Sequence, residues 1–200
     1  MSDYVFLFDL DSTITKKEIL PEISVLIGRE KEIRAVTEST MKGEIPFEES
    51  FLKRVKILSQ ISVKTVNKLV SEIPLNEEIV RFMTENRDRC YVVTGNLDIW
   101  ISGLMNRLGM MDHCLCSTAR DDNDTVGEVL TIRNKYATAK SFKEPLVVIG
   151  DGDNDSEMAA QAAIGIGYGG VRPIAPSLLN VIDYAFYDEE KCAAFLRGLL

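Results

Sequence analysis

The sequence predicts an α/β protein with a doubly wound parallel sheet, a Rossmann-like core, and a small all-helical cap inserted after the first strand. Short apolar runs that are typical of buried parallel strands occur at residues 4–8, 90–93 and 146–149. Helical patterns lie between these runs, and strands that alternate with helices favour a parallel sheet. A long segment after the first run has helical patterns and no clear buried strand, which predicts the cap.

Each of the three apolar runs ends in a cluster of small or acidic residues. These clusters are Asp9-Leu10-Asp11, Thr94-Gly95 and Gly150-Asp151-Gly152. In an open α/β sheet, ligands bind beyond the carboxyl ends of the strands. We therefore expect the three clusters to converge on one site, although they are far apart in the sequence.

The helical patterns divide the chain into two predicted parts. Residues 1–14 and 75–200 form the expected catalytic core, and residues 15–74 form the expected cap. One apolar helix face in the cap is predicted from residues at every fourth position and two leucines beside them: Phe47, Phe51, Val55, Leu52 and Leu58. Asn76, which precedes two glutamates, is typical of a helix start. The polar, turn-rich stretch 118–126 is interpreted as a hairpin or a loop.

The composition argues against some classes of function. The 200-residue chain has 23 Lys and Arg against 31 Asp and Glu, a net charge of −8. An acidic chain without a basic stripe repels a phosphate backbone, so nucleic-acid binding is not expected. No apolar run is long enough to cross a bilayer, and Met1-Ser2-Asp3 lacks the basic start of a signal peptide. With four cysteines expected to be reduced thiols, we predict a cytoplasmic protein without membrane partners.

The paired aspartates at the end of the first predicted strand suit the hydrolysis of a small phosphate monoester. Such esters react very slowly without help, because the dianion repels nucleophiles and the leaving alkoxide needs a proton. One of Asp9 and Asp11 can attack phosphorus and form an aspartyl phosphate, and the other can protonate the leaving group and later deprotonate water. Magnesium prefers hard oxygen ligands. We predict a Mg²⁺ site made of Asp9, the Asp11 backbone carbonyl and Asp151, with Asp155 steadying the set.

The aspartate motifs are informative in combination. A single Asp-x-Asp fits a turn or a helix cap equally well. Here, however, Asp9-Leu10-Asp11-Ser12-Thr13 follows one apolar strand and Gly150-Asp151-Gly152-Asp153-Asn154-Asp155 follows another. Together with Thr94-Gly95 and a later lysine, these segments resemble the four motifs of the haloacid dehalogenase superfamily in order and in strand-end context. The resemblance implies that Asp9 is the nucleophile and Asp11 the acid/base.

The same resemblance implies a set of phosphate contacts. The Thr94 hydroxyl and the Gly95 amide are expected to bind the phosphate, and Asn154 is a further expected contact. A lysine is expected to neutralise the phosphate and the nucleophile. We assign it to Lys135, because Asn134-Lys135 opens a helix-like segment. The spacing to the last motif is short, so Lys140 stays an alternative, and either lysine could be plain surface charge.

The predicted cap resembles that of the phosphoserine phosphatases. Glu18 stands seven residues after the second aspartate, and the run Met41-Lys42-Gly43-Glu44-Ile45-Pro46-Phe47-Glu48-Glu49-Ser50-Phe51-Leu52-Lys53-Arg54-Val55 is similar to a Met-x-Gly…Phe-Glu-x-Ser…Arg-Val pattern of that family. The resemblance implies that Glu18 faces a substrate amine, that Arg54 holds a carboxylate, and that Met41 and Phe47 close over the site. The alternatives are a helix-capping Glu18, a solvated Arg54, and purely structural Met41 and Phe47.

Two departures from that family bear on the substrate. The second motif reads Thr94-Gly95-Asn96-Leu97-Asp98, where the family usually has Ser-Gly-Gly-Phe, so Asn96 places a polar side chain beside the phosphate-binding turn. Asp153 adds a negative charge where a small residue is common. Both changes leave the nucleophile in place. A phosphotransferase or mutase that uses the same aspartyl phosphate, and a non-catalytic binding module, remain as alternative functions.

A second phosphatase pattern in the chain is interpreted as coincidence. Residues 113–120 fit His-Cys-x5-Arg, which is typical of cysteine-dependent phosphatases. That chemistry needs a cradle of backbone amides that leads into a helix. The segment has no glycine, and the acids at 121–124 would repel phosphate and raise the pKa of the Cys114 thiol.

Overall fold

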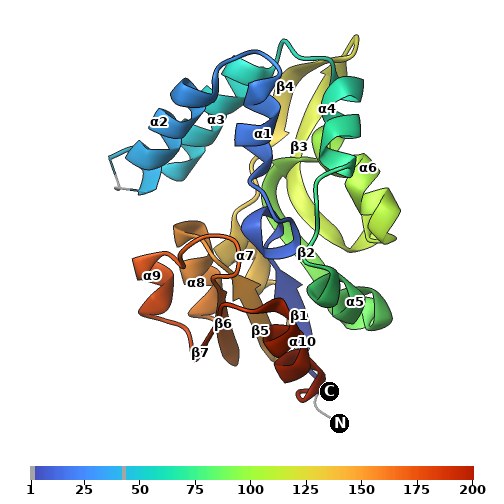
Figure 1. The fold of residues 1–200 in the computed structure, drawn as a ribbon, viewed down its shortest axis with the longest axis vertical. Coiled ribbons are helices and arrows are strands. Elements are labelled where there is room, and N and C mark those ends of the chain that lie inside the picture. Colours follow the sequence, from blue (N-terminus) through green and yellow to red (C-terminus); the bar gives the residue numbers. More distant parts are fainter. Residues whose placement is uncertain (1–2, 42–43) are drawn as a thin grey trace.

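The structure is a computed structural model that describes residues 3–41 and 44–200. Within these residues, seven strands form one sheet in the order β4-β3-β2-β1-β5-β6-β7 (Figure 1). The strands are β1 (Val5–Phe8), β2 (Cys90–Leu97), β3 (Cys114–Asp122), β4 (Thr125–Thr131), β5 (Leu146–Gly150), β6 (Ile164–Tyr168) and β7 (Tyr184–Phe186). All neighbouring pairs are parallel except β3 and β4, which form an antiparallel hairpin. The predicted α/β fold is confirmed, and the stretch 118–126 is a hairpin.

Helices cover both faces of the sheet. On one face, Phe6 and Phe8 of β1 pack with Phe82, and the ring centroids of Phe6 and Phe82 lie 5.1 Å apart. This face carries α5 (Glu77–Glu85), α6 (Asp98–Leu108) and α10 (Glu189–Arg197). Leu7 belongs to the opposite face, which carries α7 (Lys135–Lys140), α8 (Ser156–Ala159) and α9 (Pro176–Leu179). The alternation arises because successive side chains of a strand point to opposite faces.

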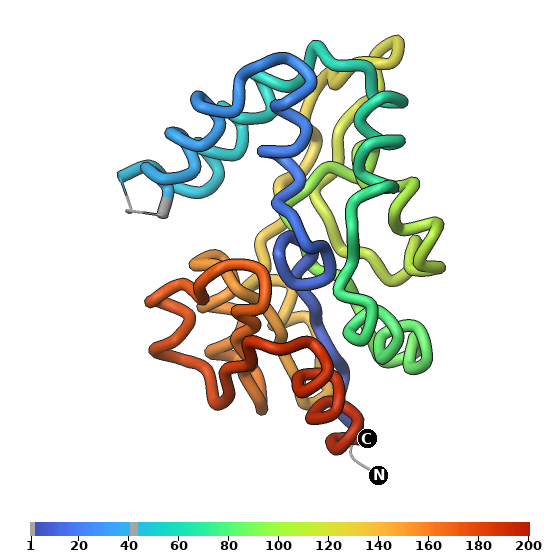
Figure 2. The backbone as a smooth tube through the Cα atoms, viewed as in Figure 1, coloured from blue at the N-terminus to red at the C-terminus, as the bar shows by residue number. Residues whose placement is uncertain are grey.

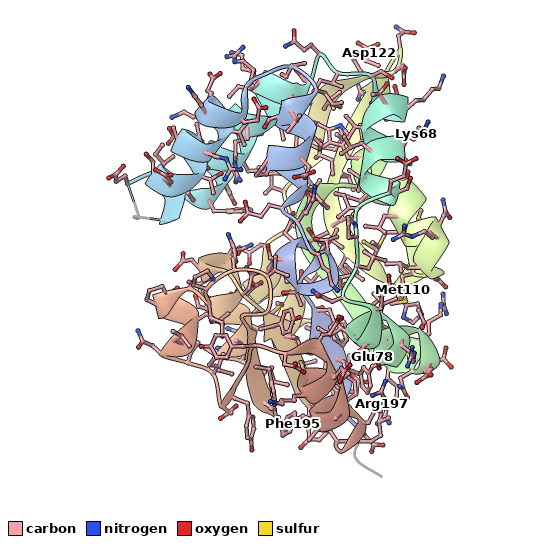
Figure 3. All side chains as sticks on the ribbon, viewed as in Figure 1. Lys68, Glu78, Met110, Asp122, Phe195 and Arg197 are labelled. Carbon is pink, nitrogen blue, oxygen red and sulfur yellow. The ribbon has the colours of Figure 1, made fainter. Side chains whose placement is uncertain are left out.

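Helix α5 begins directly after Asn76, as predicted, but the Asn76 side chain does not cap it. Its Nδ2 donates to the Thr13 carbonyl at 2.8 Å, and its Oδ1 accepts from the Tyr168 hydroxyl at 3.2 Å. These bonds satisfy a buried amide and join the turn after β1 to β6. An ion pair of 3.2 Å between Glu78 and Arg197 then joins α5 to α10 (Figure 3).

Between β1 and α5, the described residues form four α-helices. These are α1 (Ile19–Val25), α2 (Glu30–Met41), α3 (Phe47–Leu58) and α4 (Val63–Ser71). In α3, the predicted apolar face is buried at Phe51, Val55 and Leu58. Leu52 is 45% exposed, so its predicted place beside that face is wrong. Consecutive residues of an α-helix are rotated by about 100°, and Leu52 directly follows Phe51, so it turns outward.

Helix α4 is bound to the core by side-chain hydrogen bonds, whereas α2 and α3 lie away from those contacts. Helix α4 packs on α6, where Asn67 Nδ2 donates to the Ile99 carbonyl at 3.0 Å. The tip of the β3–β4 hairpin also holds α4, because the Asp124 carboxylate accepts from Ser62 Oγ at 2.6 Å and from the Lys64 backbone N–H at 2.9 Å. Helices α2 and α3 lie on the other side of the molecule from α4 and α6 (Figure 2). The assignment of residues 15–74 to one cap stays a prediction.

Two further observations concern the chain as a whole. Its four cysteines are free: Cys90, Cys114, Cys116 and Cys192. Among residues 3–41 and 44–200, no helix combines the length and the apolar character that a membrane span requires.

Candidate active site

A cavity of about 720 Å³ lies at the carboxyl edge of the sheet. Its lining includes Asp9 and Asp11, which follow β1, and Gly95, which lies near the end of β2. Helix α3 contributes Phe47 and Arg54 from the other side. The lining therefore comes from the sheet edge and from helices α2 and α3, which lie at the upper left in Figure 1. This is the place where the sequence predicts that the motifs converge.

The turn after β1 places two carboxylates at this edge. The Asp9 backbone N–H continues the sheet ladder to the Ile149 carbonyl at 2.8 Å. Ser12 then adopts a φ of 59°, in the left-handed region that residues other than glycine rarely occupy. Its N–H donates to the Thr15 hydroxyl at 3.2 Å, which helps to hold the turn. Strained turns of this kind persist where the surroundings fix them, and they are often found at functional sites.

Lys135 lies between two aspartates beneath the cavity. Its Nζ donates to Asp9 and to Asp155 Oδ1, the latter at 2.6 Å. Lys135 is 4% exposed, and burial by itself lowers its pKa, but the negative charges of Asp155 and Asp9 outweigh burial, so the pKa is raised and the lysine stays protonated. Lys140 is exposed, with its Nζ 4.5 Å from the centroid of the Tyr136 ring. The geometry thus favours Lys135 over Lys140 as the motif lysine.

Three buried carboxylates form a group that fits a divalent cation. Asp9, Asp151 and Asp155 each offer a carboxylate oxygen, and these oxygens lie within 4.8 Å of one another. Within the described part of the chain, Asp151 Oδ1 has no hydrogen-bond partner. Burial raises the pKa of Asp9 well above its ordinary value and that of Asp151 to about 7. A hard divalent cation would supply the missing partner and the missing positive charge.

The Asp11 carboxylate lies outside this group. Its Oδ1 accepts from the Ile19 backbone N–H at 2.7 Å, so it caps the start of α1, and its Oδ2 accepts from Asn96 Nδ2. Burial raises the pKa of Asp11, while the bonds from Ile19 and Asn96 oppose that rise. The backbone carbonyl is the part of Asp11 that the sequence assigned to the metal. The two carboxylate oxygens of Asp11 are therefore held by Ile19 and Asn96, and not by contacts with Asp9, Asp151 or Asp155.

The second motif is organised by Asn96. Thr94 is fully buried, and its Oγ1 accepts from the Asn96 backbone N–H at 3.1 Å and from Asn96 Nδ2 at 3.0 Å. Asn96 thus connects the predicted phosphate-binding hydroxyl to Asp11. The sequence signalled Asn96 as a departure, but its contact with Asp11 was not predicted. Asn154, another predicted phosphate contact, is exposed and lines the cavity.

Helix α3 presents Phe47 and Arg54 to the same cavity. Phe47 lies against Gly95, where an added Cβ would be 2.8 Å from the tip of the ring, so a larger residue at this position would push the ring away. Phe47 also stacks on Phe51 with a centroid distance of 6.0 Å. The side chain of Met41, the other predicted closing residue, lies outside the described part of the structure.

Arg54 is buried rather than solvated. It is 9% exposed, its Nε donates to the Ser50 carbonyl at 3.3 Å, and one terminal nitrogen donates to Thr37 Oγ1 at 3.4 Å. Among residues 3–41 and 44–200, no carboxylate forms an ion pair with it. Burial lowers the pKa of Arg54, while Asp11 and Glu18 oppose this. A buried guanidinium with spare donors is suited to bind an anion that enters the cavity.

The structure adds Arg172, which was not predicted. Arg172 lies after β6 and forms ion pairs with Glu18 and with Asp151. Burial alone would lower its pKa, but Asp151 and Glu18 outweigh burial and raise it. A sequence signal was present, because the run Ile164-Gly165-Ile166-Gly167-Tyr168 is followed by Gly169, Gly170 and Val171 and then by this arginine. If this run had been assigned as a further parallel strand, Arg172 would have been expected at the same edge of the sheet as the aspartates.

The His-Cys-x5-Arg segment does not form a phosphate loop. Most of it runs along strand β3, and His113 Nδ1 lies 3.0 Å from the Cys90 carbonyl. The pKa of Cys114 is raised, first by its hydrogen bond with Cys116 and then by burial. A thiol whose pKa is raised is a poor nucleophile, so this geometry agrees with the interpretation of the pattern as coincidence.

The fold and the site define an α/β protein with a mostly parallel sheet whose carboxyl edge carries a buried cluster of aspartates paired to a lysine. A model of the family described as haloacid dehalogenase-like hydrolase matches residues 6–160. The chain belongs to this family.

The chain is also similar to several proteins described as phosphoserine phosphatases. A phosphoserine phosphatase from Methanocaldococcus jannaschii is 30% identical over 178 residues, which cover 82% of this chain and 84% of that protein. One from Idiomarina loihiensis is 30% identical over 203 residues, covering 92% and 88%. A solved structure described as a phospho-aspartyl intermediate analogue of phosphoserine phosphatase superposes with a TM-score of 0.80 at 25% identity, covering 98% of this chain and 99% of that one.

Proposed function

We propose that this chain is a Mg²⁺-dependent phosphomonoester hydrolase that forms an aspartyl phosphate on Asp9 and acts on phosphoserine or a similar small phosphorylated metabolite. The observation that carries the proposal is the position of Lys135, which lies between Asp9 and Asp155 beneath the cavity. The named relatives support both the chemistry and the substrate class.

Asp9 is the proposed nucleophile. It is 4% exposed, and the charge of Lys135 opposes the rise of its pKa that burial causes. An ionised carboxylate at this place can attack the phosphorus of an ester held in the cavity. Asp9, Asp151 and Asp155 would hold Mg²⁺, which neutralises charge on the phosphoryl group when bound. Lys135 keeps the attacking carboxylate in position and adds a fixed positive charge next to it.

Asp11 is the proposed acid and base. Burial raises its pKa, which favours the protonated form that can give a proton to the leaving oxygen. The bonds from the Ile19 N–H and from Asn96 fix the direction of the carboxylate. After the alcohol leaves, the ionised Asp11 can take a proton from the water that hydrolyses the aspartyl phosphate.

Arg54 is the proposed site for a second anionic group of the substrate. Its guanidinium is buried and lines the cavity, and its two hydrogen bonds go to neutral oxygens. A carboxylate in the cavity can therefore pair with it without displacing a protein anion. This supports a small ester that carries both a phosphate and a carboxylate.

Phosphate release from L-phosphoserine with Mg²⁺ tests the proposal. Wild type, Asp9→Asn and Cys114→Ser are compared, with an aryl phosphate as a second substrate. We expect release that is lost in Asp9→Asn by a factor of at least about 10³ and is retained in Cys114→Ser. Release that does not depend on Asp9 would disprove the mechanism. Asp9-dependent release from the aryl phosphate alone would keep the mechanism and replace the substrate.

A further inference from the structure

We infer that Arg172 determines specificity by occupying Glu18, so that the site prefers a small phosphomonoester that has a carboxylate but no ammonium group. The inference rests on the proposed function and narrows its substrate. In the sequence comparison, Glu18 is the residue expected to face a substrate amine. The contacts of Glu18 in the structure decide whether it is free to do so.

Glu18 already has a cationic partner. Arg172 donates to Glu18 Oε1 through one terminal nitrogen and to Asp151 Oδ2 through Nε. The Arg172 side chain is 26% exposed and lines the cavity, while Asp151 is buried. The arginine therefore approaches the cavity with its charge balanced by two carboxylates, one of which is Glu18.

Losing the Glu18 carboxylate would cost Arg172 more free energy than it would cost a substrate ammonium, which can stay in water. A largely buried guanidinium that loses its carboxylates keeps the full cost of its desolvation. Its second partner, Asp151, belongs to the group of carboxylates that fits a divalent cation. If Asp151 turns to a cation, Glu18 is the remaining carboxylate that the described structure pairs with Arg172. An ammonium that entered would compete with Arg172 for Glu18, in a cavity that Arg54 and Lys135 also line.

The other carboxylates around the cavity do not offer a second buried site that could bind a substrate ammonium in place of Glu18. Asp11 already accepts from the Ile19 N–H and from Asn96. Three further acids line the cavity, and all of them are exposed to solvent: Glu48, Asp153 and Glu157. Arg54, by contrast, is buried without a carboxylate partner in the described residues. Among residues 3–41 and 44–200, the cavity thus offers a buried cation for a substrate anion, and its buried carboxylates already have partners.

The first test compares two esters that differ only at the amine. These are L-phosphoserine and 3-phosphooxypropanoate, in which hydrogen replaces the ammonium group. With wild-type protein and Mg²⁺, we expect kcat/KM to be at least about tenfold higher for the ester without the amine. Arg172→Met, which frees Glu18, is expected to reduce this ratio at least about tenfold, and Arg172→Lys is expected to retain it in part. Arg120→Met, at an exposed arginine paired with Glu128 in the hairpin, is the matched control and should leave the ratio unchanged.

A binding measurement gives a readout that does not depend on turnover or on metal. Calorimetry on Asp9→Asn protein in the presence of a chelator compares the same two esters. We expect the ester without the amine to bind more tightly, because Arg172 donates to Glu18 and competes with a substrate ammonium for it. This measurement and the wild-type ratio remain decisive if Arg172→Met does not fold.

The outcomes separate this inference from the proposed function. A wild-type preference for phosphoserine that is lost in Glu18→Gln would overturn the inference, because Glu18 would then bind the ammonium, and the proposed function would stand. Equal binding of the two esters would also overturn it. The absence of Asp9-dependent release from every ester, an aryl phosphate included, would overturn the proposed function and this inference with it.

Discussion

The cavity has a floor, the sheet edge with Asp9, Lys135 and Asp155, and a roof, helices α2 and α3 with Arg54. The two regions differ in how firmly their charged side chains are held. On the floor, Lys135, Asp9 and Asp155 are at most 4% exposed and bind one another. On the roof, Arg54 has two long hydrogen bonds to neutral oxygens and spare donors. A preorganised floor suits a reaction step that is common to many esters, whereas a few loosely engaged groups on the roof suit the choice among esters. The predictions below test this division.

Among the substitutions that compare the two regions, the largest effect is expected from Lys135→Met. This change leaves Asp9 and Asp155 without their shared cation, so we expect phosphate release to fall by at least about 10²-fold and the free energy of unfolding to fall by ~3–5 kcal/mol. Steady-state kinetics and urea denaturation measure the two quantities. Lys140→Met is the matched control, because Lys140 is exposed, and should change stability by no more than about 0.5 kcal/mol. A full loss of activity in Lys140→Met with Lys135→Met unaffected would reverse the assignment.

A roof substitution should separate binding from chemistry. Arg54→Ala removes the proposed partner of a substrate carboxylate, and we expect KM for a carboxylate-bearing ester to rise about 10- to 100-fold. An aryl phosphate has no carboxylate, so its KM should stay within about twofold of wild type. Kinetics with both substrates provide the test. Equal losses on the two substrates would show that Arg54 acts on the floor chemistry instead.

The metal-free floor should lose stability as pH rises. Asp151 has a pKa of about 7 in the folded chain, first because of burial, against about 4 in an unfolded chain. The folded state therefore holds a proton that the unfolded state has released, so the stability from protonated Asp151 is full below about pH 4 and is lost as pH rises through about 7. In chelator, we expect Tm to be several degrees lower at pH 8 than at pH 5.

Thermal denaturation followed by circular dichroism measures this dependence. Asp151→Asn removes one titrating group and should reduce the pH dependence, of which the raised pKa of Asp9 keeps a part. Added Mg²⁺ should restore the Tm of the wild type at pH 8. A metal-free Tm that is equal at both pH values would contradict the assigned role of burial at Asp151.

The smallest effect is expected from Asn96→Ala, at the boundary between the two regions. Asn96 orients Asp11, so its loss should lower kcat about tenfold for an alkyl phosphate, whose leaving group needs a proton. An aryl phosphate has a better leaving group and should be affected less. Asn106→Ala, at an exposed position of α6, is the control. A uniform loss on both substrates would indicate that Asn96 acts through Thr94 and the phosphate rather than through Asp11.

Local patterns were sufficient to predict the strands and the floor. A buried parallel strand is a continuous apolar run, and a motif at its end inherits a fixed place at the sheet edge. Asp9 and Asp151 were predicted in this way, whereas Lys135 was assigned through the family resemblance at the start of a helix-like segment, and the structure brings the three together. The contacts of side chains whose partners come from other helices or strands were harder to predict. Asn76 was expected to begin a helix, and the structure adds its bonds to Thr13 and Tyr168.

The sequence by itself determined the α/β fold, the order of the motifs and the aspartate chemistry that they imply, because these follow from periodicity and from residues adjacent to strand ends. The tertiary structure alone decided that Glu18 is paired with Arg172, 154 residues further along the chain. It also decided that Asn96 bonds to Asp11 across 85 residues. Such contacts depend on how separate loops meet at one edge of the sheet, and no local pattern records that meeting.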